Sequence, residues 1–305
     1  MAPPVEINAI KNKMRREDLY NKLRQEKERK KLEERIARRK LEVSNPALKA
    51  QRLAENVPDT LERLREADDT MVDAEDAEVA EDEATDEFAS YFNGEADPKI
   101  MVTTTHMAKR LTVQFARDFT RIFPTAEFFK RQREFTIKRM VELAKKRDYT
   151  DMVVVNDGGH GPWSMTFIHL PEGPTMVFKL GKTMKLTADI KGAGRATRHS
   201  PELIMNNFST RLGHTVGRMF ASMFPPNPEF EGRQVATLHN QRDFIFFRRH
   251  RYIFDDTKTC RLQELGPRFS LKLMSLQKGT FDSTQGEYEW VQKSEHETSR
   301  RRFFL

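Results

Sequence analysis

A basic and aromatic segment in the second half of the chain has the residue types that suit contact with a polyanion. The run Arg233–Arg242 contains Arg, Gln, His and Asn, and the run Phe244–Tyr252 interleaves aromatic rings with Arg248, Arg249 and Arg251. Arginine contacts phosphates, amide and imidazole side chains can read exposed base edges, and aromatic rings stack on unpaired bases. The segment, including Arg233 and Arg242, is therefore a candidate RNA-binding region.

This segment has two interpretations. In one, the phenylalanines lie in the hydrophobic core and only the arginines face outward. In the other, the rings themselves stack on bases. We favour the core for the phenylalanines, and solvent or phosphate for Arg248, Arg249 and Arg251. The sequence has neither a GFxF-type ribonucleoprotein signature nor a helix-turn-helix motif, so sequence-specific DNA recognition is not supported. The basic run Arg300–Arg302 is either a further electrostatic contact or a soluble tail.

The residues that could support catalysis form no recognisable constellation. Gly213–Gly217 resembles a phosphate loop, but it lacks the Gly-Lys-Ser/Thr ending and lies in a helical pattern, where small residues allow close packing. Asp157–Gly161 is glycine-rich, but no helix follows it. The eight histidines occur singly, and Cys260 has a basic neighbour but no base that the sequence can position. We expect no catalytic residue, metal, cofactor or small-molecule substrate, and keep an enzyme as a minor alternative.

The overall charge narrows the class of partner. The 305 residues carry a formal net charge of +7, which favours a nucleic acid or an anionic membrane surface. No run of eighteen apolar residues occurs, and Met1–Ile10 lacks the apolar stretch of a secretory signal, so we expect no membrane partner. The single cysteine excludes a disulfide within the chain and favours a reducing compartment, the cytosol or nucleus.

Charge is unevenly distributed along the chain. Residues 1–40 contain 14 Lys and Arg against 7 acids, residues 66–97 contain 14 acids and no Lys or Arg, and residues 41–65 balance. Since the whole chain carries +7, residues 98–305 carry +14. The folded part is therefore much more basic than the whole chain suggests.

A long charged helix is predicted over residues 8–42, because acids and bases recur three or four residues apart, as in Glu26 and Lys30. Its apolar positions are too sparse to form a core, and Asn45-Pro46 should end it. Two interpretations are about equal: a solvated helix, and a basic arm over residues 1–45 that becomes ordered on RNA.

Residues 46–97 are interpreted as a linker whose acidic part is disordered on its own. Its end differs, because Phe88, Tyr91 and Phe92 lie close together in a polar setting and should dock on a surface. We interpret residues 86–92 as an anchor that packs on a partner or on the chain's own domain.

Globular patterns begin at residue 98. Helices are predicted near residues 111–122 and 133–147, where apolar residues recur with a period near 3.6. The expected strands are residues 100–104, 127–129, 152–155, 163–170 and 175–180. Alternating short strands and helices predict a mixed α/β fold.

The second half is predicted to open on a helix over residues 201–224. Ser200 is a candidate N-cap, Pro201 fits the first helical position, and Pro225-Pro226 should end the helix. Strands are expected near residues 234–238, 244–247 and 269–273. The alternation of Phe269, Leu271 and Leu273 with polar residues gives the last strand one apolar and one polar face.

The two halves also repeat a pattern. Ile122-Phe123-Pro124 is followed by Glu127-Phe128 and Arg131-Gln132, and Met223-Phe224-Pro225 is followed by Glu229-Phe230 and Arg233-Gln234. A duplication is favoured over coincidence. Two similar lobes, over about 98–180 and 181–279, would create a groove between them.

Several motifs of the second half together resemble those of the Brix-domain family. They are Asn206–Phe208, Arg211–His214, Gly217–Phe220, Gly232–Thr237, His239–Asp243, His250–Phe254, Leu265–Leu273 and Ser275–Thr280. The resemblance continues in Phe281–Ser283, Gly286–Trp290 and, upstream, Asp86–Phe92. It covers roughly residues 80–305 and is more specific than any short motif. The loop at 182–199 and the residues near Gly158–Trp163 depart from the family's pattern.

This resemblance implies an α/β Brix domain over residues 98–279, built from two lobes like the anticodon-binding domain of class II tRNA synthetases, with a C-terminal extension over 280–305. It implies a non-catalytic factor in the nucleus and nucleolus that binds pre-rRNA of the large ribosomal subunit. The implied protein partners are other assembly factors, including one small dedicated protein. The family assigns RNA binding to the closing motif, which gives as candidates Arg261, Arg268, Lys272 and Lys278. A small-subunit factor and a protein adaptor without RNA contact are the alternatives.

Overall fold

The computed structural model describes residues 11–57, 59–72, 76–256, 259–282 and 284–305. The chain divides into two compact units, Met1–Arg63 and Leu64–Leu305. The first contains helices α1 (Lys13–Ser44) and α2 (Pro46–Glu55), which meet at an ion pair between Arg52 and Glu42. The predicted helix and its end before Pro46 are confirmed, although residues 8–10 of the prediction lie outside the described residues.

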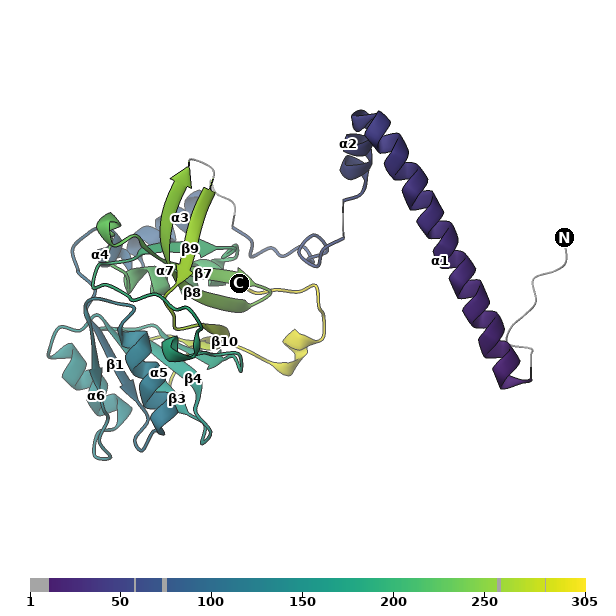
Figure 1. The fold of residues 1–305 in the computed structure, drawn as a ribbon. Helices are drawn as coiled ribbons and strands as arrows, with labels where there is room; N and C mark the ends of the chain where they lie inside the picture. The colour runs from purple at the N-terminus through teal and green to yellow at the C-terminus, as the bar shows by residue number, and fades with distance from the viewer. Residues whose placement is uncertain (1–10, 58, 73–75, 257–258, 283) are drawn as a thin grey trace. The chain divides into compact units, whose positions relative to one another are not determined.

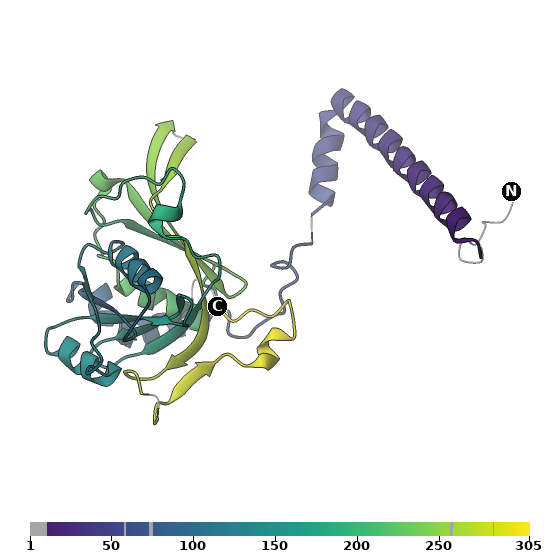
Figure 2. The ribbon, with the colours of Figure 1, turned by 60° about the horizontal axis from the view of Figure 1, so that its bottom comes forward.

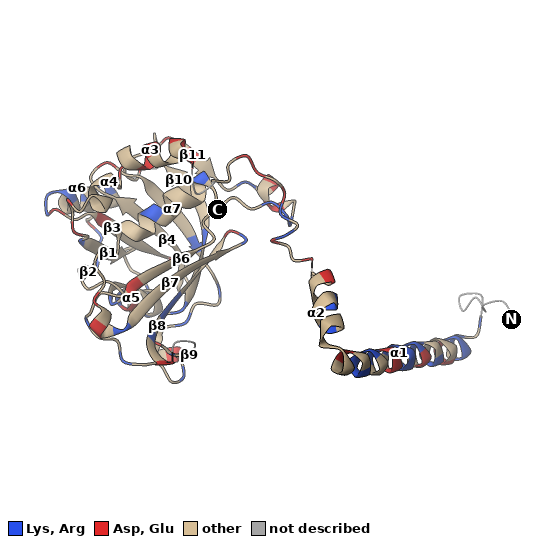
Figure 3. Ribbon diagram, turned by 90° about the horizontal axis from the view of Figure 1, so that it is seen from above, with Lys and Arg blue, Asp and Glu red and all other residues tan. Residues whose placement is uncertain are grey.

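Helix α1 is stabilised locally, because none of its residues is buried. Asn12 accepts a hydrogen bond from the Arg15 amide at 3.2 Å and so caps the first turn. Ion pairs one turn apart follow, such as Arg24 with Glu28 at 3.0 Å. Each exposed pair of this kind contributes only about 0.3–0.5 kcal/mol. Basic and acidic residues recur along the length of the helix (Figure 3).

Unit Leu64–Leu305 is built on one 11-stranded sheet in which the order along the main path is β2-β1-β3-β4-β5-β10-β8-β7-β6. In the first half the strands are β1 (Ile100–Thr104), β2 (Ala126–Phe129), β3 (Asp151–Asp157), β4 (Pro162–His169) and β5 (Thr175–Leu180). In the second half they are β6 (Glu202–Asn206), β7 (Gln234–Gln241), β8 (Phe244–Asp256), β9 (Thr259–Glu264), β10 (Phe269–Gln277) and β11 (Tyr288–Val291). The antiparallel pairing of β5 with β10 joins the two halves. The predicted α/β class is confirmed.

Two amphipathic helices, α5 (Arg110–Thr120) and α7 (Arg211–Ser222), share one core on the inner face of this sheet. Phe119 of α5 and Phe220 of α7 both contact Phe167 of β4, with ring centroids 6.1 and 5.3 Å apart. The sheet curves around α5 (Figures 1 and 2). The aromatic core therefore holds both halves in one compact unit.

On the opposite, outer face of the sheet, an α-helix packs only over the first half of the described residues. Helix α6 (Ile137–Lys145) packs there against the alternate residues of β1, β3 and β4, such as Met101 and Met152. Because both faces of these strands are covered, their sequences contain continuous apolar runs. In the described residues, short 3-10 helices lie at Thr187–Asp189, Phe230–Gly232 and Ser294–Glu297.

The predicted helix over residues 201–224 is wrong in its first part. Glu202–Asn206 forms strand β6, which pairs in parallel with β7. The helix begins only at Arg211, where the Thr210 hydroxyl accepts a hydrogen bond from the Gly213 amide at 2.9 Å. Thr210, not Ser200, is thus the N-cap, because pairing with a strand some 30 residues away overrides the local signal.

The acidic residues before the predicted domain belong to the same compact unit. Helices α3 (Ala77–Thr85) and α4 (Ala89–Phe92) lie against α7, and Phe88 between them is fully buried in the shared core. The C-terminal residues also pack on this unit, since the side chain of Leu305 is 1% exposed. We call the described residues 76–92 the acidic segment.

The burial of Phe88 gives a first prediction. Phe88→Ala removes a ring from a closed core, so the free energy of unfolding should fall by about 3–5 kcal/mol. Phe92 is 46% exposed, and Phe92→Ala should cost about 1 kcal/mol or less. Denaturant titration followed by tryptophan fluorescence measures both values. Equal losses in the two variants would show that Phe88 does not belong to the core.

Candidate nucleic-acid interface

The outer face of the sheet in the second half is a polar and aromatic surface without a covering helix. Strand pairing places its residues side by side: Phe244 faces Lys272, Lys272 faces Lys179, and Phe246 lies between His239 and Ser270. We call this surface the outer sheet face. Its members are Lys179, His239, Phe244, Phe246, Arg248, His250, Ser270 and Lys272.

Alternation along the strands explains why these residues point outward. Their neighbours Ile245, Phe247, Leu271 and Leu273 are at most 3% exposed and belong to the core. Since successive side chains of a strand point to opposite faces, the residues between them must lie on the other side. The polar face predicted for Phe269–Leu273 is confirmed.

At one end of the outer sheet face a hollow of about 300 Å³ is bordered by aromatic and cationic residues, including Lys179, Lys182, Phe244 and Lys272. The Lys272 ammonium lies 5.4 Å from the centre of the Phe244 ring and 2.7 Å from a Glu297 carboxylate oxygen. Phe244 is 42% exposed. An exposed ring beside ammonium groups can stack on a base while the cations contact adjacent phosphates.

At the other end, Arg248, His250 and Arg268 surround one carboxylate, that of Glu264. Arg268 Nε donates to Glu264 at 2.9 Å, and this hydrogen bond is the main cause that lowers the pKa of Glu264. Burial and the charge of Arg268 lower the pKa of Arg248, and burial is the first cause that lowers the pKa of His250. Two arginines with one acid leave this end positive, which suits a phosphate backbone.

The structure brings together only some of the predicted RNA-binding residues. Arg248, Arg268 and Lys272 lie on or beside the outer sheet face. Arg233 and Arg242 are exposed at turn positions with positive φ, and Arg261 projects from the β8–β9 hairpin, where it pairs with Asp255. Lys278 is exposed beyond β10, 4.0 Å from Glu287. The half-buried Arg251 points to the inner side and donates to the Arg195 carbonyl at 3.1 Å.

Two expectations about this segment are wrong. Arg249 does not face solvent: it is 2% exposed, because it points into the sheet's inner side and donates to the Arg121 carbonyl at 2.8 Å and to Gln234 Oε1 at 2.6 Å. Conversely, Phe244 is not a core residue, and Phe246 on the same face is only half-buried. The alternation of side chains along β8 explains both cases. The outward-facing residues Phe244, Phe246 and Arg248 alternate with the inward-facing residues Ile245, Phe247 and Arg249.

Lys179 was not predicted as a site residue. It lies on β5, about 90 residues before the closing motif, and joins the site only through pairing with β10. Its alternation with buried Phe178 and Leu180 marked it as outward-facing, but the sequence could not show which strand pairs with β5.

Comparison with known sequences identifies the family. The profile of the Brix domain matches residues 105–275, which is more than half of the chain. The chain belongs to the Brix-domain family. It is 52% identical over 307 residues to ribosome production factor 1 of Xenopus laevis, covering all of this chain and 88% of that protein. It is 45% identical over 307 residues to ribosome production factor 1 of Saccharomyces cerevisiae, with full coverage of both chains.

Among solved structures, a probable ribosomal biogenesis protein from Aeropyrum pernix K1 matches 64% of this chain and 99% of its own, with 15% identity and a TM-score of 0.44. All eight members of the outer sheet face lie within the matched Brix residues, 105–275. In the described parts of the chain, no group of three or more His, Cys, Asp or Glu side chains is placed to hold a metal ion. No described helix has both the length and the apolar character needed to cross a membrane.

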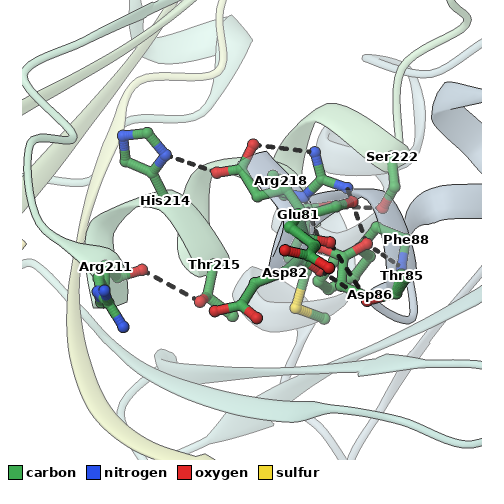
Figure 4. Close-up of polar contacts among 12 residues, drawn as sticks. Glu81, Asp82, Thr85, Asp86, Phe88, Arg211, His214, Thr215, Arg218 and Ser222 are labelled. Atoms are coloured by element: carbon green, nitrogen blue, oxygen red, sulfur yellow. Dashed lines mark hydrogen bonds and ion pairs between the residues drawn. The ribbon is translucent and has the colours of Figure 1, made fainter. Parts of the chain in front are cut away.

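The acidic segment neutralises a second basic surface of the Brix domain, the exposed side of α7 (Figure 4). Glu78 pairs with Arg211 at 3.1 Å, and Glu83 lies 2.7 Å from His214. Arg218 makes two hydrogen bonds to the Asp86 carboxylate, at 2.5 and 2.7 Å. These contacts give the cations of α7 acidic partners, as Glu264 and Glu297 do for Arg268 and Lys272. The outer sheet face is the better candidate for RNA because it also has Lys179, which is exposed and lies between Ser164 and Lys272 in the sheet.

The predicted anchor residues Phe88 and Tyr91 are held by the chain's own domain. Phe88 is fully buried, and the Tyr91 hydroxyl donates to the Phe224 carbonyl. Phe92 is 46% exposed and lies under the Arg218 guanidinium, 4.2 Å from the ring centre. Of the two predicted roles, packing on the own domain is the one observed for Phe88 and Tyr91.

His169 links the acidic segment to the sheet. Its Nδ1 lies 2.8 Å from Asp151, and the Glu87 carbonyl also contacts the ring. Burial lowers the pKa of His169, but the hydrogen bond and charge of Asp151, together with the Glu87 carbonyl, raise it above its ordinary value overall. Two acceptors on one ring favour the imidazolium, which has two donors.

This contact predicts a pH dependence. The pKa of His169 in the folded protein is raised from 6.5. Protonated His169 therefore stabilises the folded protein fully below about pH 6.5, and this stabilisation is lost as the pH rises through the folded-state pKa. The free energy of unfolding of the wild type should therefore decline over that range relative to His169→Gln. Denaturation at several pH values measures the difference. The exposed His160 provides the control: His160→Gln should keep the decline, and a decline that persists in His169→Gln would contradict the assignment.

Proposed function

We propose that this protein is a non-catalytic factor of ribosome biogenesis that binds precursor rRNA of the large subunit on the outer sheet face. The observation that carries the proposal is a sheet surface that places a ring and two cations in register, from the exposed Phe244 across Lys272 to the exposed Lys179. The name shared by the relatives, ribosome production factor 1, supports the biological setting. The charge of +14 on residues 98–305 supports a polyanionic ligand.

A binding role is also supported by the burial of the most enzyme-like pair. His169 and Asp151 are 7% and 1% exposed, and Phe88 packs on the imidazole with ring centroids 4.8 Å apart. A hollow of about 380 Å³ borders His169, but Asp151 does not line it. The pair therefore has a structural explanation.

The proposal also covers the location of the protein in the cell and its protein partners. We infer a nucleolar protein in large-subunit precursors that works beside other assembly factors, including a small dedicated protein. An apolar hairpin supports a protein partner: Ile253, Phe254 and Leu262 of β8 and β9 are 48%, 68% and 61% exposed. Exposed apolar groups of this kind are typical of protein contacts. Co-purification with large-subunit rather than small-subunit precursors tests the setting.

The ring and cations give the central mutational prediction. Replacing Lys179 and Lys272 together by Gln should weaken RNA binding, because two phosphate contacts are lost, and should lower the slope of log affinity against log salt by about two. Phe244→Ala should cost about 1–3 kcal/mol of binding free energy with little change of that slope. Fluorescence anisotropy with a labelled fragment of precursor rRNA, titrated at several salt concentrations, measures both quantities.

A control of equal charge uses Lys145 and Lys146 of the α6 end, which are both exposed. Their double replacement by Gln should leave the salt slope within about half a unit of the wild type. Should the α6 variant lose as much affinity as the β5–β10 variant, binding would reflect net charge rather than this surface.

A further inference from the structure

A second basic hollow lies on the inner side of the sheet, where the end of α5 approaches the loop before β6. Its volume is about 410 Å³. The residues around it are Thr120, Arg121, Ile122, Phe123, Pro124, Ala126, Ala196, Thr197, Arg198, His199 and Arg249. None of these residues is acidic, so the hollow combines three arginines and a histidine without a carboxylate in its lining.

Arg249 is the buried member of this set. It is 2% exposed, and in the described part of the chain its hydrogen-bond partners are two neutral oxygens, the Arg121 carbonyl at 2.8 Å and Gln234 Oε1 at 2.6 Å. Its Nε atom has no hydrogen-bond partner. Burial alone lowers the pKa of Arg249 to about 10, so the guanidinium is still charged at neutral pH.

Three other enclosed cations of the domain have carboxylate partners. Arg218 faces Asp86 and Glu83, Arg268 faces Glu264, and Lys272 faces Glu297. For Arg249 the end of α5 supplies only the partial negative charge of its last carbonyls. A buried charge that lacks a full counter-charge normally acquires one, from the protein or from a ligand.

The rim of the hollow adds further donors. The Arg121 side chain is 73% exposed and pairs with Asp118 at 3.0 Å, outside the lining. Arg198 is exposed, and His199 Nδ1 lies 2.9 Å from the Thr197 hydroxyl. Guanidinium groups at the base and rim of one hollow match the oxygens of a tetrahedral oxyanion.

We propose that this hollow binds a phosphate group against Arg249, Arg198 and Arg121. The phosphate is either a phosphodiester of the bound RNA, which rests on the proposed function, or a free phosphate or phosphorylated metabolite, which does not. In both cases the anion supplies the negative counter-charge that the Arg249 guanidinium lacks. The site is separate from the outer sheet face, because Arg249 and Arg248 point to opposite sides of β8.

Thermal unfolding of the full chain tests the site itself. Inorganic phosphate, compared with potassium chloride of equal ionic strength, should raise the melting temperature of the wild type, because a ligand that binds only the folded state stabilises it. The rise should be lost in Arg198→Gln and in Arg249→Met. The control Arg110→Gln removes an equally exposed arginine from the other end of α5 and should keep the rise. No phosphate-specific rise in the wild type, or a rise that persists in both test variants, overturns the proposal.

RNA binding by the same variants distinguishes the two sources. If the phosphate belongs to RNA, Arg198→Gln should weaken RNA binding by about tenfold and lower the salt slope by about one. If RNA binding is unchanged while the phosphate response is lost, the ligand is a free phosphate and the site stands. Failure of the proposed function has a different signature, namely loss of RNA binding from the wild type with the phosphate response retained.

Discussion

The pairing of β5 with β10 is the constraint on which the rest of the structure depends. It joins the two halves of the chain edge to edge, with Leu180 opposite Leu271 and Phe178 opposite Leu273. Both halves can then bury their helices, α5 and α7, in one aromatic core on the same face. A register shift by one residue would place these apolar residues on the outer face and Lys179 and Lys272 in the core, which fixes the register strongly.

This arrangement also creates the candidate site. The sheet needs its inner face for the core, and α6 covers the outer face of the first half only. The second half is therefore left with a solvent-facing sheet surface, and the residues there are cationic and aromatic. Side chains on a rigid sheet are positioned without loops, so a ligand that binds them costs the protein little conformational entropy.

Charge is divided between two surfaces with different consequences. The cations of α7 are paired with the acidic segment, whereas at one end of the outer sheet face two arginines, Arg248 and Arg268, share the single carboxylate of Glu264. The segment's acids thus lower the whole-chain charge without covering the outer sheet face. This explains how a chain with a net charge of +7 can present a strongly basic surface.

Local patterns predicted the first half well, because its strands and helices carry clear periods and are bounded by prolines. They failed at Glu202–Asn206, where Ser200-Pro201 looks like a helix start and only pairing with β7 makes a strand. They also failed at Arg249, whose acceptor at Arg121 is 128 residues away. The family resemblance correctly predicted the fold class, but its closing motif contained only part of the outer sheet face, because Lys179 and Phe244 are joined to it by tertiary contacts.

Ultraviolet crosslinking of the full chain to RNA in cells, with the crosslinked peptides identified by mass spectrometry, tests the central claim most directly. The account predicts crosslinked peptides from β8 and β10, with Phe244 among the modified residues, and attached sequences from large-subunit precursor rRNA. Crosslinks confined to α6 or to residues 11–57, or a complete absence of crosslinked ribosomal RNA, would contradict it.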